Sequence, residues 1–229
     1  MNYDIQSAYG GAVSSTQERN KVLRNTYWLL ALSMVPTVLG AWVGVASGIT
    51  ALMSPMVSLV VFLAGAFGFM FAIEKTKNSS AGVPLLLAFT FFMGLMLSRM
   101  VGMVLGLSNG AGLIMMAFAG TGAIFLGMAT LSSVIKRDLS AMGKWLFIGA
   151  IMLLVAGIAN IFLKSPALMI TLAVLAIGIF SAFILHDLKR VQDGHETNYI
   201  TATLGVYLSL YNVFQSLLAL FGIFGGRDE

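Results

Sequence analysis

Seven long apolar runs occupy most of this chain, and they limit what it can fold into. Each run is close to or above the ~20 residues with which an α-helix crosses about 30 Å of hydrocarbon. The runs cover residues 25–47, 52–73, 83–107, 111–135, 143–163, 166–187 and 199–224. Inside a bilayer every backbone N–H and C=O must be paired within the protein, and a helix pairs its own. The runs therefore predict an all-α integral membrane protein, a bundle of seven transmembrane helices.

The composition agrees with a membrane protein and excludes several kinds of chemistry. Hydrophobic residues make up 59% of the chain and charged residues only 10%, whereas a soluble domain is usually ~25% charged. The chain contains no cysteine, which excludes disulfides, thiolate metal sites and thiol catalysis. In a membrane protein a net charge of +4 reports orientation, so we expect the lipid bilayer, and not nucleic acid, as a partner.

The first 22 residues differ from the rest because they are polar and rich in Gly, Ser and Gln. They are too polar to begin a secretory signal peptide, and the apolar run after them exceeds the roughly 7–15 residues of a cleavable signal. We therefore expect a disordered cytoplasmic tail at 1–22 and a seven-helix transmembrane domain at 23–229.

Lysine and arginine are distributed unequally between the two ends of the predicted helices. Ten of the thirteen lie in the tail or near the connections that follow the second, fourth and sixth spans. They are Arg19, Lys21, Arg24, Lys75, Lys77, Lys136, Arg137, Lys144, Lys189 and Arg190. Because cytoplasmic loops carry an excess of these residues, we expect a cytoplasmic N-terminus and, after seven crossings, a C-terminus outside.

The last apolar run carries a stripe of polar side chains. At 100° per residue, six polar residues fall within roughly 160° of the helix circumference. They are Thr201, Ser209, Tyr211, Asn212, Gln215 and Ser216. The opposite arc holds Val206, Leu210, Val213, Phe214, Leu217 and Leu220. An unpaired polar group in hydrocarbon costs several kcal/mol, so we expect the stripe to face protein or water and the last helix to be central.

Glycines recur at every fourth position in two of the spans. Gly40, Gly44 and Gly48 form such a ladder in the first span, and Gly102 and Gly106 form one in the third. Small residues allow helix backbones to approach closely in a membrane. We expect these glycines to pack helices together inside the bundle, with a contact between two copies of the chain as the alternative.

Arg99 is a charge deep inside the third span. It follows Pro84 by 15 residues, which places it roughly 22 Å along the helix. Burying an arginine costs about 2.5 kcal/mol or more, so we expect its side chain to reach the outer headgroups. The alternative is a carboxylate or carbonyl partner. Asp187 is not expected to be that partner, since straight helices place the two residues near opposite membrane faces.

Asp187 ends the sixth span, about 32 Å from the start of that helix at Pro166. This distance places it at the inner rim of the membrane, and two interpretations remain open. In the first, it is an interfacial residue next to Lys189 and Arg190. In the second, its carboxylate faces the polar stripe of the last helix and serves as a proton sensor or a cation ligand.

Two patterns suggest chemistry that their context does not support. Residues 106–110 match G-x-S-x-G, but a nucleophile elbow needs a preceding strand and a histidine partner, and this loop lies between two apolar runs. Potential metal ligands also gather near the inner end of the sixth span: His186, Asp187, Asp193, His195 and Glu196. The two histidines lack helical i, i+4 spacing, so we expect a solvated loop of mixed charge. We expect no enzyme activity, no metal and no cofactor.

Four stretches of the chain resemble a known family. They read KVLRNTYWLLALS at the first span, AFTFFMGLMLS at the third, IANIFLKSPAL across the fifth and sixth, and GHETNYITATLGVYLSLYNVFQSLLALFG at the end. On these stretches the chain resembles the Bax inhibitor-1 family of membrane proteins and, within it, the bacterial YccA-like branch. The resemblance implies a seven-helix bundle with the last helix central, in the bacterial inner membrane.

Two functions are implied by this resemblance. The YccA-like branch is associated with FtsH, a membrane-anchored ATP-dependent protease, as its substrate and modulator. Other members of the family resemble pH-sensitive calcium or proton leak channels that are gated by two aspartates. Asp187 matches the first aspartate, whereas the second falls on Ser209, which cannot carry the charge. Ser98-Arg99 also replaces the usual Gly-Pro of the family.

For the leak channel, the sequence predicts an ion path along the last helix. The residues expected to line it are Asp187, Ser209, Tyr211, Asn212 and Gln215. The polar tail at 1–22 instead suits a membrane protein that a protease grips by one end. We therefore expect modulation of FtsH as the first function and the leak channel as the alternative.

Overall fold

The computed structural model describes the backbone of residues 3–225 and the side chains of residues 16–225. This part of the chain contains seven α-helices and no β-strand. The helices are α1 (Tyr3–Ser47), α2 (Pro55–Thr76), α3 (Gly82–Leu105), α4 (Gly110–Val134), α5 (Met142–Leu163), α6 (Pro166–Gln192) and α7 (Tyr199–Gly225). Each is long and apolar enough to cross a membrane. The predicted fold class, an all-α bundle of seven membrane-spanning helices, is confirmed.

Two of the helices start at a serine that is followed by proline. The Ser165 side chain accepts a hydrogen bond from the Leu168 N–H at the start of α6. Ser54 accepts one from the Val57 N–H at the start of α2. Proline at the first helical position has no N–H that could remain unpaired, so these two spans begin at well-defined residues.

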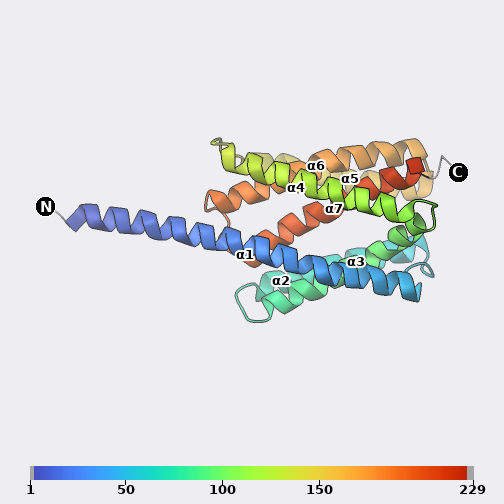
Figure 1. Ribbon diagram of the computed structural model, residues 1–229, viewed down its shortest axis with the longest axis horizontal. Helices are drawn as coiled ribbons and strands as arrows, with labels where there is room; N and C mark the ends of the chain where they lie inside the picture. The colour runs from blue at the N-terminus through green and yellow to red at the C-terminus, as the bar shows by residue number, and fades with distance from the viewer. Residues whose placement is uncertain (1–2, 226–229) are drawn as a thin grey trace.

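Helix α1 is much longer than the predicted first span. Its 45 residues correspond to a length of about 68 Å, more than twice the ~30 Å of a hydrocarbon core. Figure 1 shows its N-terminal end projecting beyond the other helices. Lengthening an existing helix requires no new nucleus, which explains why α1 continues through residues 3–22, predicted as a disordered tail. The division of the chain at residue 22 stays a prediction.

Helix α6 also continues beyond the end that its apolar run predicts. It was expected to end at Asp187, whereas it ends at Gln192. Lys189 Nζ donates to Asp193 Oδ1 at 2.7 Å, an i, i+4 pair. Such pairs and cations in the last turn stabilise a helix. The predicted charged turn is therefore helical in its first half.

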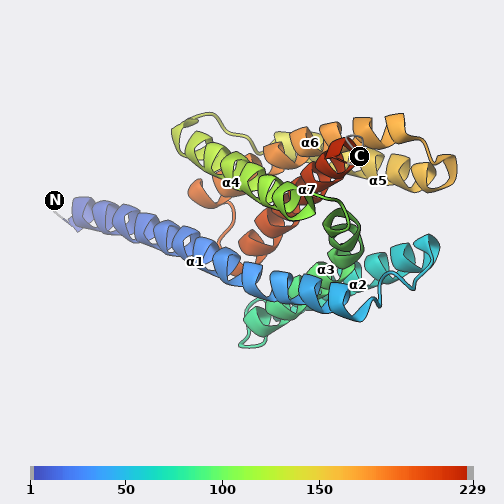
Figure 2. The same cartoon turned by 45° about the vertical axis from the view of Figure 1, so that its right-hand side comes forward.

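Helix α7 lies in the middle of the bundle. It contacts α1, α3, α4 and α6. Two views show it running diagonally between α1, α2 and α3 on one side and α4, α5 and α6 on the other (Figures 1 and 2). On the outside, α2 packs on α3 and α5 packs on α6. The central position predicted for the last helix is confirmed.

The larger cluster of buried apolar side chains includes residues from the contact of α7 with α1 and α3. Tyr207 and Phe89 are almost completely buried, and their rings meet edge to face with centroids 6.1 Å apart. The Tyr207 hydroxyl lies 2.9 Å from Thr37 Oγ1 and 3.4 Å from the carbonyl oxygen of Thr90. A buried phenol needs a hydrogen-bond partner, and α1 and α3 provide it.

Glycines allow α1 and α3 to approach each other closely. Gly40 of α1 lies against the carbonyl of Phe91, and Gly94 of α3 lies against the carbonyl of Thr37, so neither position has room for a Cβ. Gly44 also packs against α3, but there it lies against the side chains of Ser98 and Leu95. Close backbone approach of this kind is how helices associate in a membrane. The ladder of the first span is therefore an internal packing contact at Gly40 and Gly44.

The remaining glycines of the two predicted ladders do not make such contacts. Gly48 follows the last residue of α1 with a φ of 66°, a backbone conformation that favours glycine. A Cβ on Gly102 would make only an ordinary contact with Val45. The close contact of α3 lies instead at Gly94. Spacing alone does not tell which face of a helix meets its neighbour, and for this reason the sequence analysis missed Gly94.

Gly94→Ala is expected to destabilise the bundle, because the added Cβ meets the carbonyl oxygen of Thr37. Overpacking of this kind costs about 1–3 kcal/mol, so unfolding in detergent, followed by circular dichroism, should occur at a lower temperature. Gly122→Ala in α4 is the matched control, since a Cβ there meets no atom within 4 Å. Equal unfolding temperatures for the two variants would contradict the close α1–α3 contact.

Candidate functional site

Asp187 lies on α6 and faces the central helix. Its side chain is 18% exposed, and its Oδ1 is 3.1 Å from Nδ1 of His186. On the other side, a Cβ added to Gly205 of α7 would lie 2.9 Å from Asp187 Oδ2. Since Gly205 has no side chain, the carboxylate can lie directly against the α7 backbone. This is the placement that the second interpretation of Asp187 requires.

A cavity of about 200 Å³ lies beside this carboxylate. Residues of α6, of α7 and of the turn between them line it: Asp187, Arg190, Glu196, Thr201, Ala202, Leu204, Gly205 and Leu208. Thr201 Oγ1 is buried and has no hydrogen-bond partner in the part of the chain that the structure describes. A space of this size with charged and hydroxyl groups in its wall can hold several water molecules. Water molecules in this cavity can therefore solvate a proton or a small cation at Asp187.

His186 is buried, although the sequence analysis expected it in a solvated loop. It is only 6% exposed, and a Cβ added to Gly143 of α5 would lie 2.7 Å from its Nε2. The imidazole thus fills the space between α5 and Asp187. The correction has the same cause as the longer α6: the helix carries His186 into the bundle instead of ending beside it.

Two predicted path residues of α7, Ser209 and Tyr211, are buried. Ser209 Oγ donates to the carbonyl of Gly205 at 3.1 Å, so Ser209 lies one helical turn beyond the glycine that faces Asp187. Tyr211 donates to the carbonyl of Met93 in α3 at 3.3 Å. Ser209 is thus near the carboxylate, whereas the hydroxyl of Tyr211 serves the contact with α3.

Asn212 and Gln215, the other two predicted path residues of α7, are half-buried. The polar stripe to which they belong is not the only face of α7 that is buried. Asn212 Nδ2 donates to the carbonyl of Leu208 at 2.8 Å, within the same helix. Val206 and Val213 of the opposite arc are completely buried. A polar side chain can use the carbonyl one turn back, and a central helix is packed on all sides. The stripe therefore predicts the central position of α7 but not the rotation of α7 about its own axis.

Arg99 lies at the other end of the bundle from the α6–α7 turn and contacts the loop between α1 and α2. Its Nη1 donates to the carbonyl oxygen of Met53 at 3.0 Å, and the residue is half-buried. The carbonyl partner that the sequence analysis named as the alternative is thus present. The neighbouring Ser98 bonds to Thr50 Oγ1 at 2.7 Å. Both side chains hold this loop onto α3.

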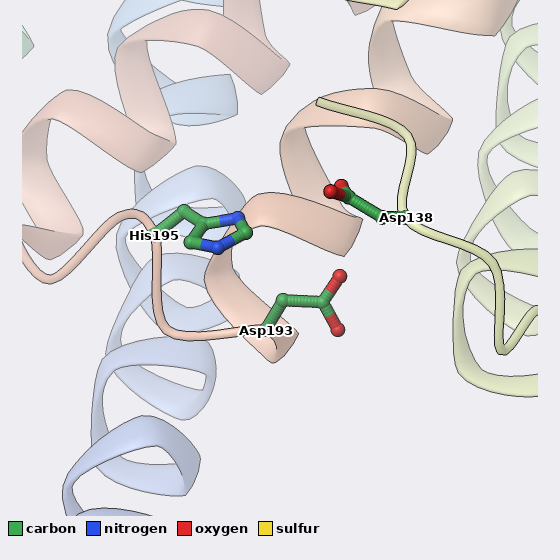
Figure 3. Close-up of side chains that lie close together, drawn as sticks. All are labelled: Asp138, Asp193 and His195. Carbon is green, nitrogen blue, oxygen red and sulfur yellow. The ribbon is translucent and has the colours of Figure 1, made fainter. Parts of the chain in front are cut away.

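Three potential metal ligands come together outside the membrane-spanning part. Ligand atoms of Asp138, Asp193 and His195 lie within 4.8 Å of one another. Figure 3 shows that Asp138 comes from the loop after α4, and the other two from the turn after α6. Protein groups engage them: Lys189 pairs with Asp193, and Ser140 bonds to Asp138 and to His195. Exposed acidic groups often meet without an ion, and the absence of a metal stays a prediction.

Asp138 was missed by the sequence analysis, because 55 residues separate it from Asp193 in the chain. Its carboxylate accepts hydrogen bonds from the side chain and the backbone N–H of Ser140 at 2.6 and 2.8 Å. These two bonds stabilise the charged form and lower the pKa of Asp138. No local pattern connects this loop to the α6–α7 turn, so only the fold reveals the contact.

Gln192 joins three helices at this end of the bundle. Its Nε2 donates to Oγ of Ser132, at the end of α4, at 2.8 Å. Its carbonyl oxygen accepts a hydrogen bond from Arg19 of α1 at 3.5 Å. Helix α1 is thereby held against α6 at Arg19, next to the turn that contains Asp193 and His195.

Comparison with known proteins gives concordant results. A family model described as "Inhibitor of apoptosis-promoting Bax1" matches residues 19–226. The chain is 37% identical over 222 residues to the "Modulator of FtsH protease YccA" of Escherichia coli K12, covering 94% of this chain and 98% of that protein. It is 38% identical over 217 residues to an uncharacterized membrane protein of Vibrio cholerae, covering 95% and 96%. An uncharacterized protein of Neisseria meningitidis serogroup A is 37% identical over the whole of both chains.

Ser140→Ala is expected to raise the pKa of Asp138 toward its ordinary value. The substitution removes the hydrogen bond from the Ser140 hydroxyl, which lowers this pKa more than the bond from the Ser140 backbone N–H does. In the parent protein the stabilisation is present at neutral pH and is lost as the pH falls through the lowered pKa. A carbon-13 NMR titration of labelled aspartates in detergent measures the change. Ser133→Ala, which removes an exposed hydroxyl bonded within α4, is the control. An unchanged Asp138 titration in Ser140→Ala would refute the assigned cause.

Proposed function

This chain belongs to the Bax inhibitor-1 family, and on that basis we propose that it is an inner-membrane protein, not an enzyme, that binds and modulates the FtsH membrane protease. One observation carries the proposal: the chain is 37% identical, over nearly its whole length, to a protein named as a modulator of this protease. A second relative of equal identity carries the name of an inner membrane protein. The role would affect the quality control of other membrane proteins.

A modulator of a processive protease must offer a segment that the protease can grip and a body that resists extraction. The long α1 supports the first requirement, because it continues well beyond the length needed to cross the membrane. The close packing of α1, α3 and α7 around Tyr207 supports the second. The excess of Lys and Arg on one side supports a cytoplasmic N-terminus and a C-terminus outside, which would expose α1 to a cytoplasmic protease domain.

Removal of residues 2–15 is expected to lengthen the half-life of the protein in cells severalfold, because the protease loses the end that it grips. Pulse-chase labelling in cells with and without FtsH measures the effect. A variant in which residues 2–15 are shuffled keeps the length and composition of the segment and should be degraded like the parent. Equal turnover of the deletion variant and the parent would count against this proposal.

A leak of protons or calcium ions is the second candidate function, and the placement of Asp187 favours it. The carboxylate faces α7 at Gly205, beside a cavity, and Ser209 follows one turn further along α7. A second carboxylate at position 209 would lie close enough to interact with Asp187 and to share a proton with it at low pH. In the parent chain the Ser209 hydroxyl cannot fulfil that role, so any flux would depend on Asp187 alone.

Asp187→Asn is expected to reduce cation flux into proteoliposomes that contain the purified protein, whereas Ser209→Asp should increase the dependence of flux on pH. Asp193→Asn is the control, because it removes the same charge from the turn outside the α6–α7 contact. Flux that is identical in the parent and in Asp187→Asn would exclude this carboxylate from the path.

A further inference from the structure

One face of α1 forms a groove of about 470 Å³ that the proposed functions do not use. Five residues line it: Asn20, Leu23, Arg24, Tyr27 and Trp28. Their spacing of three and four residues places them on one side of the helix. Trp28 is 69% exposed, and Arg24 is exposed as well. The groove therefore has an amide and a cation at one end, with Leu23 between them, and the aromatic side chains of Tyr27 and Trp28 at the other.

Contacts with neighbouring helices place this groove level with the α6–α7 turn and the first turns of α7. Arg19, just before it, bonds to the carbonyl of Gln192 at the end of α6. The carbonyl of Thr26, within its length, accepts a hydrogen bond from Thr203 in the first turns of α7. Arg24 thus lies between the level of the α6–α7 turn and the level at which α7 enters its apolar run. Trp28 lies one helical turn deeper, where tryptophan is enriched in membrane proteins.

Arg24 has no hydrogen-bond or ion-pair partner among residues 16–225. A guanidinium group offers two parallel N–H donors that match a phosphate. At the surface of a bilayer, lipid phosphates are available to such a cation, and those of anionic lipids attract it more strongly because no headgroup cation compensates their charge. Tyr27 and Trp28 continue the same face toward the hydrocarbon, and a free phosphate ion has no apolar part that would contact them.

We infer that this groove binds an anionic phospholipid, with the headgroup phosphate on Arg24 and Asn20 and an acyl chain along Tyr27 and Trp28. The charge and the aromatic residues fit the two halves of such a lipid in their natural order along the membrane normal. A helix of a partner protein would fit the apolar half but would need its own carboxylate opposite Arg24. The inference is independent of the FtsH proposal and of the leak channel.

Trp28 itself reports whether the groove is occupied. The chain has three tryptophans, so replacing Trp42 and Trp145 by phenylalanine leaves Trp28 as the only one. This full-length variant is reconstituted into phosphatidylcholine vesicles that contain brominated phosphatidylglycerol or, in a parallel series, brominated phosphatidylcholine. The fraction of brominated lipid is varied over the same range in both series. Since one basic residue contributes about a fivefold preference for an anionic lipid, Trp28 should be quenched at about a fivefold lower fraction of brominated phosphatidylglycerol.

Arg24→Ala should remove this preference, and Arg24→Lys should retain part of it, because lysine keeps the charge but loses the paired donors. Lys21→Ala is the matched control. It removes the same charge from an exposed position one turn away on the same helix, yet Lys21 does not line the groove, so the preference should persist. Both positions are exposed, and circular dichroism checks that the three variants fold.

Three results would overturn the inference. The first is equal quenching of Trp28 by the two brominated lipids in the parent. The second is an equal loss of preference in Lys21→Ala and Arg24→Ala, which would indicate a diffuse surface charge. The third comes from a photo-crosslinking amino acid at position 24 in native membranes. Crosslinks to a polypeptide instead of a lipid would show that a partner protein covers the groove.

Discussion

The hydroxyl of Tyr207 and the glycines beside it hold the centre of this bundle together. A buried phenol on the central helix must find a partner, because no water is available in the hydrocarbon layer. It finds Thr37 on α1 and the carbonyl of Thr90 on α3. Those groups come within reach only because Gly40 and Gly94 let the backbones of α1 and α3 approach. The hydrogen bonds of Tyr207 therefore depend on the close packing of α1 and α3, and the position of α7 depends on both.

The two ends of the bundle differ in what this rigid centre supports. At one end, Arg99 and Ser98 hold the loop after α1 in place. At the other end lie the titratable groups of the α6–α7 turn, the cavity beside Asp187 and the projecting part of α1. Titratable side chains thus gather where α6, α7 and α1 meet, whereas the contacts described at the opposite end hold a loop in place.

Both candidate functions use this end of the molecule, but they require different properties of it. Modulation of a protease requires a long α1 on a body that does not unfold, and Gln192 connects that helix to α4 and α6. A leak requires that the contact between Asp187 and Gly205 opens when the charge of the carboxylate changes. A serine at position 209 leaves this contact with one carboxylate, which explains why the sequence similarity to a modulator carries more weight than the geometry of a gate.

The sequence by itself determined the seven spans, the fold class and the central position of the last helix, because each follows from apolar length or from polar groups that cannot face lipid. It also identified the ladder glycines Gly40 and Gly44 as packing residues, whereas the role of Asp187 stays a prediction. The tertiary structure decided which helix faces meet: it buried His186, brought Asp138 to Asp193 and placed Gly94 against α1. The physical reason is that helix periodicity is a local property. Contacts between distant segments depend on how every helix is rotated about its own axis, and no run of residues records that rotation.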